Sequence, residues 1–261
     1  MNELLISEAQ LNQFIGQYLW PLLRVSAFYF AVPVIGARMV PARVRILLSL
    51  LTVMLLSPML PEIPTTPFLS LGGMVMVVKE VLIGLALGFM LQVVMHVFVL
   101  AGQLIAMKMG LGFASMNDPS NGVSVTVLSQ FYLLMTTLLF LSINGHLIVI
   151  QMLVDSYEAF PLTGEGLQPS HFFTVFSMGS WMFSVALVIC LPLFTSLLVV
   201  NMSFGVMSRS APQMNVFTVG FPITLIFGLL LMWYGLGNFL PLFESIMQEG
   251  FLIVLQLLEA P

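Results

Sequence analysis

Long apolar segments separated by short polar stretches dominate this chain. Most of the six apolar segments exceed the roughly 20 residues that a membrane-spanning helix needs. They run over Ala9–Ile35, Ile46–Leu60, Phe68–Met107, Val123–Val154, Phe172–Met207 and Met214–Phe243, and a shorter apolar stretch, Phe251–Leu258, follows. No Asp, Glu, Lys or Arg lies between Glu165 and Arg209, or between Arg209 and Glu244. The pattern predicts an all-α membrane protein with about six long apolar segments.

Several segments are interrupted from within, so straight helices are not expected. A proline removes a backbone donor and bends a helix, and four prolines fall inside or at the end of apolar segments: Pro21, Pro33, Pro192 and Pro222. Lys79 and Glu80 lie inside the third segment, where a charge at the bilayer centre costs about 2.5–3.5 kcal/mol. This pair must therefore lie near an interface or face protein. Because neighbours on a helix do not face each other, no salt bridge is expected between them.

Composition supports the membrane assignment. Hydrophobic residues make up 59% of the chain and charged residues only 7%, against about 25% charged residues in a soluble domain. The net charge of −4 argues against a nucleic-acid partner, which selects basic surfaces. The single cysteine, Cys190, excludes an internal disulfide and a cysteine-based metal site.

The chain carries none of the usual catalytic signatures, and we expect neither an enzyme, nor a cofactor, nor a metal ion. His96, His146 and His171 lie on different segments, and Asp155 with Glu158 is more simply a solvated segment end. Segments four to six carry no Asp, Glu, Lys or Arg. An ion-coupled transporter usually holds such a group in its helix bundle, so this absence weakens that alternative and an intramembrane hydrolase as well.

The charges between segments alternate in sign, which predicts a topology. Arg38, Arg43 and Arg45 follow segment one, Lys108 follows segment three and Arg209 follows segment five. Acidic residues follow segments two, four and six. Because basic loops stay in the cytoplasm, both termini are expected on the other side of the membrane.

The loop between segments three and four differs from the other loops. Residues 107–122 combine glycines, methionines and a phenylalanine with an Asn-Asp-Pro turn. Glycine permits tight backbone paths, and methionine fills irregular gaps. Irregular backbone at membrane depth is tolerated only where protein buries it or where it lines a cavity. Two interpretations stay open, a pore-lining segment and an ordinary cytoplasmic turn.

Two further groups of residues are candidates for contacts with other helices or subunits. The spacing Gly84-x-x-x-Gly88 allows close approach of another helix, within the chain or between subunits. Arg209, Gln213 and Asn215, together with Pro212, lie at the predicted tip of a C-terminal hairpin. Polar residues cluster near Tyr157–His171, and we expect this break to divide the chain into two regions, residues 1–165 and residues 166–261.

Three stretches resemble the FliR family of bacterial flagella and its counterparts in virulence-type III secretion. These are Pro33-Val-Ile-Gly-Ala-Arg-Met-Val-Pro-Ala-Arg-Val-Arg45, Gly110-Leu-Gly-Phe-Ala-Ser-Met-Asn-Asp-Pro119 and Ser210-Ala-Pro-Gln-Met-Asn-Val-Phe-Thr-Val-Gly-Phe-Pro222. The likeness extends over the whole chain, in length and in segment order. The last stretch is also similar to the hairpin tip of FliQ, a smaller partner.

The resemblance implies a subunit of the flagellar export gate in the inner membrane, within the flagellar basal body. In such gates a FliR-like chain assembles with FliP and FliQ, while FlhB and FlhA associate, and unfolded flagellar subunits pass through the pore. The fold implied is one of bent helical hairpins, with a FliP-like region over residues 1–165 and a FliQ-like hairpin over residues 166–261, much of it projecting toward the periplasm. A virulence-type gate subunit and a small-molecule secondary transporter are the alternatives.

The resemblance also assigns a role to the unusual loop, which corresponds to a plug inside the pore. The residues concerned are Met107, Met109, Gly110, Gly112, Phe113, Met116, Asn117, Asp118 and Pro119. In that role, Phe113 and the methionines supply adaptable apolar bulk. The glycines supply the backbone freedom to move aside.

Overall fold

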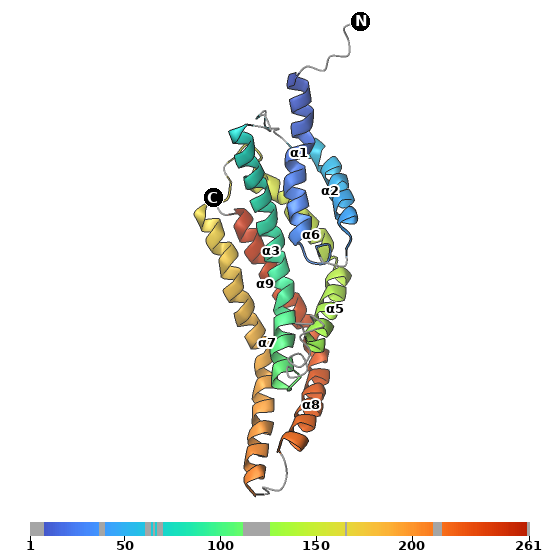
Figure 1. Ribbon diagram of the computed structural model, residues 1–261, viewed down its shortest axis with the longest axis vertical. Coiled ribbons are helices and arrows are strands. Elements are labelled where there is room, and N and C mark those ends of the chain that lie inside the picture. Colours follow the sequence, from blue (N-terminus) through green and yellow to red (C-terminus); the bar gives the residue numbers. More distant parts are fainter. Residues whose placement is uncertain are drawn as a thin grey trace. The chain divides into compact units, whose positions relative to one another are not determined.

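A computed structural model describes residues 8–36, 40–60, 64, 66, 70–111, 126–164, 166–210 and 216–259, and every element among them is helical (Figure 1). The elements follow in the order α1 (Glu8–Ala31), α2 (Ala42–Leu56), the 3₁₀ helix η1 (Ser57–Met59), α3 (Leu71–Lys108), α5 (Val127–Ser142), α6 (Gly145–Ala159), α7 (Pro169–Ser210), α8 (Val216–Gly235), the 3₁₀ helix η3 (Leu236–Asn238) and α9 (Phe239–Glu259). The predicted all-α fold is confirmed.

The predicted count of six segments needs correction at two places. Segment four is two helices, because Asn144 has φ 58° and interrupts the chain between α5 and α6. Segment six ends at Gly235, and η3 separates it from α9. Within the described residues, four stretches are long and apolar enough to cross a membrane, or five if α5 and α6 count as one broken span.

The acidic residues near the C-terminus lie within helix α9, whereas the sequence pattern places Glu244 beyond the last long segment. The helix is amphipathic: Phe243, Met247 and Val254 are buried on one side, while Glu244 and Glu249 are exposed on the other. An apolar repeat of three to four residues produces such a helix even where charges interrupt the apolar run.

The chain forms two compact units that interleave along the sequence. The first comprises residues 1–93, 144–178 and 249–261, and the second comprises residues 94–143 and 179–248. Helices α3, α7 and α9 each contribute residues to both units. Compactness and resemblance to separate partner proteins are different properties, so the division into a FliP-like and a FliQ-like region at residue 165 stays a prediction.

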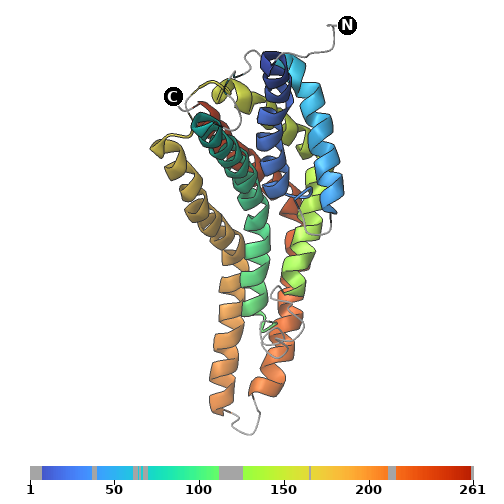
Figure 2. The same cartoon turned by 45° about the horizontal axis from the view of Figure 1, so that its top comes forward.

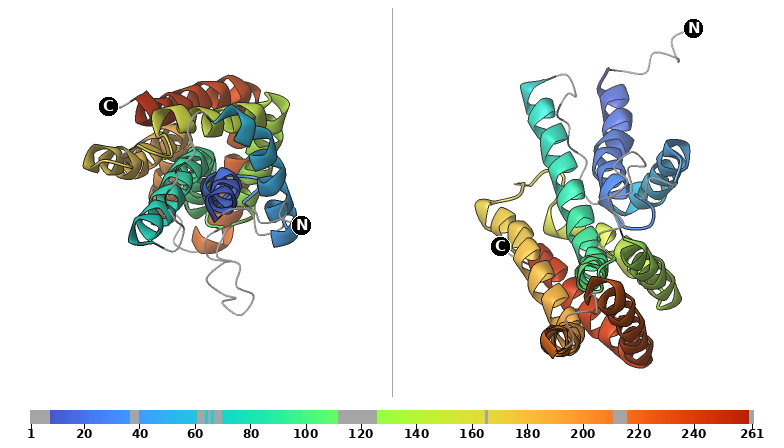
Figure 3. Two further views of the ribbon diagram at one scale, coloured as in Figure 1. Left: turned by 90° about the horizontal axis from the view of Figure 1, so that it is seen from above. Right: turned by 60° about the horizontal axis from the view of Figure 1, so that its bottom comes forward.

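In the first unit, α1 lies between α2 and the N-terminal part of α3 (Figure 3). The contact between α1 and α3 is close because glycines replace side chains on α3. A Cβ atom at Gly84 would overlap the carbonyl oxygen of Arg24, and one at Gly88 would come within 2.7 Å of the Ala31 Cβ. Helices approach this closely only where small residues line the contact.

In the second unit α5 lies beside the C-terminal part of α3 (Figure 2), and aromatic side chains pack these helices together with α9. The ring of Phe98 from α3 lies 5.5 Å, between centroids, from both Phe239 and Phe243 of α9. Tyr132 of α5 packs on Phe239 at 5.7 Å, and Gly102 lets the α5 backbone approach α3. These separations fall in the range that favours offset or edge-on aromatic pairs. The second unit therefore brings α5 and α9 onto the C-terminal part of α3.

We expect Gly84→Ala to destabilise the protein and the matched change Gly205→Ala to leave it intact. The added methyl at position 84 meets the α1 backbone, and overpacking of this kind costs about 1–3 kcal/mol. At Gly205, in the C-terminal half of α7, none of the described residues beyond the adjoining turn of the helix has an atom within 4 Å of the added Cβ. Thermal unfolding in detergent measures both changes. Equal midpoints for the two variants would show that the α1–α3 contact does not limit stability.

Candidate functional site

In the first unit, charged side chains of α1 and α3 meet each other and the C-terminal end of α6. The side chains of Arg24 and Glu80 are fully buried, and Arg24 Nε donates to Glu80 Oε2 at 2.7 Å. The two terminal nitrogens of the guanidinium donate to backbone oxygens of the α6 end. Nη1 donates to the Ser156 carbonyl and Nη2 to the Phe160 carbonyl, both at 2.7 Å.

The positions of Arg24 and Glu80 follow from the helix seam described above. Glu80 precedes Gly84 by one turn of α3, so the two share a face. Gly84 brings the backbone of α1 at Arg24 into contact with α3. The ion pair therefore lies at one end of the α1–α3 contact, beside the small residues that bring the two helices together.

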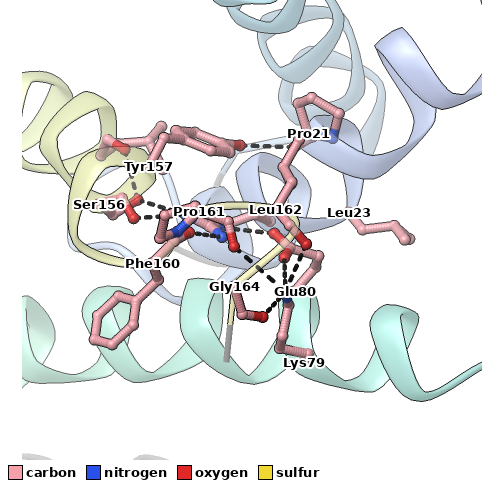
Figure 4. Close-up of polar contacts among 12 residues, drawn as sticks. Pro21, Leu23, Lys79, Glu80, Ser156, Tyr157, Phe160, Pro161, Leu162 and Gly164 are labelled. Atoms are coloured by element: carbon pink, nitrogen blue, oxygen red, sulfur yellow. Dashed lines mark hydrogen bonds and ion pairs between the residues drawn. The ribbon is translucent and has the colours of Figure 1, made fainter. Parts of the chain in front are cut away.

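An aromatic side chain of α6 completes the surroundings of Arg24. The guanidinium carbon lies 4.1 Å from the ring centroid of Tyr157, a distance at which cation–π attraction is effective. The Tyr157 hydroxyl donates to the Pro21 carbonyl at 3.1 Å (Figure 4). Tyr157 thus ties α6 to α1 at the same point as Arg24.

Lys79 extends the cluster along the turn that follows α6. Its Nζ donates to the Leu162 carbonyl at 2.7 Å, to the Gly164 carbonyl at 3.0 Å and to the Pro161 carbonyl at 3.4 Å (Figure 4). Nζ also lies 3.6 Å from Glu80 Oε1. The expectation that Lys79 and Glu80 make no salt bridge is therefore wrong. The two side chains leave α3 in different directions, but the long lysine stem lets the ammonium reach the carboxylate.

The alternative that this pair faces protein is the one that the structure adopts, since Glu80 is buried against Arg24. The sequence interpretation missed Arg24, although a signal was present. Arg24 is the only charged residue between Glu8 and Arg38 in a long apolar segment. A lone charge in such a segment calls for a buried partner. The partner, 56 residues away, could not be read from the pattern.

The start of the loop predicted to be a plug is held at the end of α3. Leu111 N–H donates to the Ala106 carbonyl at 2.9 Å and Gly110 N–H to the Met107 carbonyl at 3.2 Å. Gly110 has φ +84°, a value that suits glycine. This is the Schellman arrangement, which satisfies the last carbonyls of a helix. Gly110 is therefore the residue at which α3 stops.

Helix α8 packs against the C-terminal end of α3 at Gly110. The ring of Phe221 lies 2.6 Å from where a Cβ on Gly110 would be, and the side chain of Met109 fills the space beside Gly228. Met109 is fully buried, whereas Met107 is 53% exposed. The two methionines predicted to act together thus have different surroundings.

The chain returns from the loop at Thr126, close to the same end of α3. Gln103 Oε1 accepts hydrogen bonds from the Thr126 N–H and hydroxyl, each at 3.2 Å, and from the Ser129 hydroxyl at 2.9 Å. Thr126 also caps α5 by accepting from the Ser129 N–H. One amide oxygen of α3 therefore fixes the point where α5 begins.

Most of the remaining predicted site residues lie outside the described residues. These are Gly112, Phe113, Met116, Asn117, Asp118 and Pro119 of the loop, and Pro212, Gln213 and Asn215 of the hairpin tip. Arg209 is described: it is exposed in the last turn of α7, where a cation favours the helix dipole. Gly84 and Gly88 face α1 across the seam.

Comparison with known proteins gives matches over nearly the whole chain. The profile of the family described as "Bacterial export proteins, family 1" matches residues 15–250. The Flagellar biosynthetic protein FliR of Escherichia coli (strain K12) is 36% identical over 248 residues, 94% of this chain and 94% of that protein. The protein of the same name from Pectobacterium carotovorum subsp. carotovorum is 36% identical over 94% of this chain and 92% of its own length. The one from Bacillus subtilis (strain 168) is 30% identical over 79% and 80%.

We expect Gly110→Ala to lower the free energy of unfolding through two separable effects. A side chain at φ +84° costs about 1–3 kcal/mol in backbone strain, and the new methyl also meets the Phe221 ring. In a Phe221→Ala background only the strain remains, so the cost of Gly110→Ala should fall. Thermal unfolding of the four proteins of this double-mutant cycle provides the measurement. Additive effects would mean that Phe221 does not press on Gly110.

Proposed function

Because this chain belongs to the bacterial export proteins, family 1, we propose that it is a membrane subunit of the flagellar protein-export apparatus. The observation that carries the proposal is the match to FliR proteins over 94% of both chains. The names of these relatives describe flagellar biosynthesis and no catalytic activity. All three of the relatives described above are flagellar, which favours the flagellar assignment over the virulence-type alternative.

We propose further that the chain forms the export pore together with FliP and FliQ, and that FlhB and FlhA associate with it. Two features support a place within an oligomeric membrane assembly. Helix α7 has 42 residues and no ionisable side chain other than Cys190 between its His171 and Arg209. Its outward side chains, such as Val199, Met202 and Val206, are each more than 60% exposed. An exposed apolar helix face of this kind needs lipid or partner subunits to cover it.

The proposed orientation in the inner membrane follows from the loop charges. The basic positions around Arg43 and Arg209 would face the cytoplasm, and the connection after α6 would face the periplasm. Unfolded flagellar subunits would enter from the basic side. This orientation rests on the sequence pattern and on the resemblance to the FliR family.

The loop from Met107 to Pro119 is proposed as the seal of the resting pore. The described contacts support it in one respect: both ends of residues 112–125 are fixed near the same end of α3. The N-terminal end of this loop follows Gly110, which ends α3 and packs against α8. Its C-terminal end precedes Thr126, which Gln103 of α3 holds by hydrogen bonds. A segment held at both ends can shift between them without unfolding its neighbours. A seal is needed because the membrane potential acts with about 2.3 kcal/mol per charge per 100 mV.

The proposed assembly predicts that the chain is heterogeneous when expressed alone and becomes uniform when co-expressed with FliP and FliQ. Its exposed apolar helix faces would then be covered by partners. Native mass spectrometry of the detergent-extracted complex tests this directly. A stable, monodisperse chain that does not co-purify with FliP and FliQ, or that transports a small solute by itself, would refute the proposal.

Deleting Gly112–Ser115 should make the assembled gate permeable to ions while assembly survives. This deletion spares Met109 and Gly110, which pack against α8, so loss of the seal is separated from loss of the fold. Phe113→Ala should leak less, because neighbouring methionines partly fill the gap. Ion flux in cells that express the full gate is the measurement. If the deleted gate assembles and stays tight, the loop is an ordinary turn.

A further inference from the structure

The chain segment between α6 and α7, Phe160–Gln168, is held by two cations from other helices, the buried Arg24 of α1 and the partly exposed Lys79 of α3. We propose that Arg24 and Lys79 form a clamp that fixes this connector and so sets the point from which α7 begins. The sequence pattern identifies the region only as a polar break, which is typical of a flexible linker. In the structure, however, hydrogen bonds from Arg24 and Lys79 hold this segment.

The first half of the clamp acts on the end of α6. The last carbonyls of a helix have no partner within the helix and carry the negative end of its dipole. Arg24 supplies both a charge and donors at this end, through its bonds to the Ser156 and Phe160 carbonyls. Glu80 orients the guanidinium from the opposite side through Nε. Arg24 therefore acts as a C-terminal cap delivered from another helix.

The second half of the clamp acts on the turn itself. The ammonium of Lys79 is surrounded by the carbonyls of Pro161, Leu162 and Gly164. A Cβ on Gly166 would lie 2.7 Å from the Lys79 Cγ, so the connector also packs on the lysine stem. The connector thus contacts the Lys79 side chain both at its Cγ and at its ammonium group.

The far end of the connector is closed by the first turn of α7. His171 Nδ1 accepts a hydrogen bond from the Gln168 N–H at 2.8 Å, and the His171 N–H donates back to the Gln168 carbonyl at 3.0 Å. The His171 ring also stands edge-on to Phe160, 5.2 Å between centroids. This last contact links the clamped beginning of the connector to the start of α7.

The connector supplies acceptors to both cations of the cluster. Among the described residues, Arg24 and Lys79 share the carboxylate of Glu80, and their remaining contacts are to the negative ends of backbone carbonyls. Removing Arg24 takes a donor from the Phe160 carbonyl, and removing Lys79 takes one from the Leu162 and Gly164 carbonyls, whereas the Ser156 and Pro161 carbonyls keep the N–H groups of Phe160 and Gly164. A buried carbonyl that loses its partner costs more than the hydrogen bond itself contributes. The connector and the ion pair therefore depend on each other.

The clamp has a consequence that rests on the proposed function. If the chain joins a FliP-like region to a FliQ-like hairpin, the connector is the covalent junction between them. Separate FliP and FliQ chains must set the corresponding geometry through contacts between subunits. In this chain, Arg24 and Lys79 would set it before assembly, as positioning residues.

Hydrogen exchange measured by mass spectrometry on the co-purified complex, and on the detergent-extracted chain alone, tests the clamp. The amides of Phe160 and Gly164 donate to the Ser156 and Pro161 carbonyls, which the clamp also contacts. Lys79→Met should raise exchange at Gly164 by about tenfold or more, because the turn opens locally. Arg24→Met should do the same at Phe160.

Two further variants make the result specific. Lys79→Arg keeps the charge and donors and should hold Gly164 near the wild-type rate. Lys108→Met removes an exposed cation from the last turn of the same helix, where its Nζ contacts the Phe194 ring, and should leave both amides unchanged. Wild-type exchange at Gly164 in Lys79→Met, or equal loss of protection in Lys79→Arg, would overturn the clamp. If Lys79→Met does not fold, the remaining two variants test the clamp. Exchange should then be faster than in the wild type at Phe160 in Arg24→Met and unchanged at Gly164 in Lys79→Arg, and any other result would overturn the clamp.

The two proposals can fail separately. Exchange in the chain alone reports the clamp whether or not a gate assembles. Co-purification of the wild-type chain reports the proposed function whether or not the clamp is correct. Protected amides together with lost assembly would therefore count against the proposed function only.

Discussion

A buried arginine constrains the whole first unit of this protein. A guanidinium has five N–H donors and does not lose its charge, so the protein has to satisfy it. Arg24 obtains its partners from residues 56 to 136 positions away. Replacing one partner of a buried ion pair typically costs about 3–5 kcal/mol. The helix seam, the end of α6 and the connector must therefore all be in place together.

Helix α3 serves both units through glycines and single polar groups. Gly84 and Gly88 bring α1 close, and further along the helix Gln103 holds the start of α5. In a chain with 59% hydrophobic residues, apolar contact alone does not choose between alternative helix pairings. Close approach and hydrogen bonds do choose, because their geometry is specific and an unpaired group is costly in an apolar environment. A few positions thus specify the arrangement within each unit.

The same logic applies to the loop that we propose as the seal. The segment after Gly110 is anchored where α3 stops and where α5 starts, and the anchors lie on elements packed by Phe98, Tyr132 and Phe221. If the chain lines an export pore, as proposed, these anchors would keep the subunit intact while chains with different side chains pass.

The sequence by itself determined the helical class, the membrane location and the family, because apolar segment length and local motifs are properties of neighbouring residues. It also singled out Gly84, Gly88 and the loop after Met107. It did not reveal the break at Asn144, since one residue in a left-handed conformation leaves hydrophobicity unchanged. Only the tertiary structure decided that Arg24 meets Glu80 and that Lys79 holds the turn after α6. Those contacts join distant segments, and an apolar pattern along the chain carries no record of which distant segments meet.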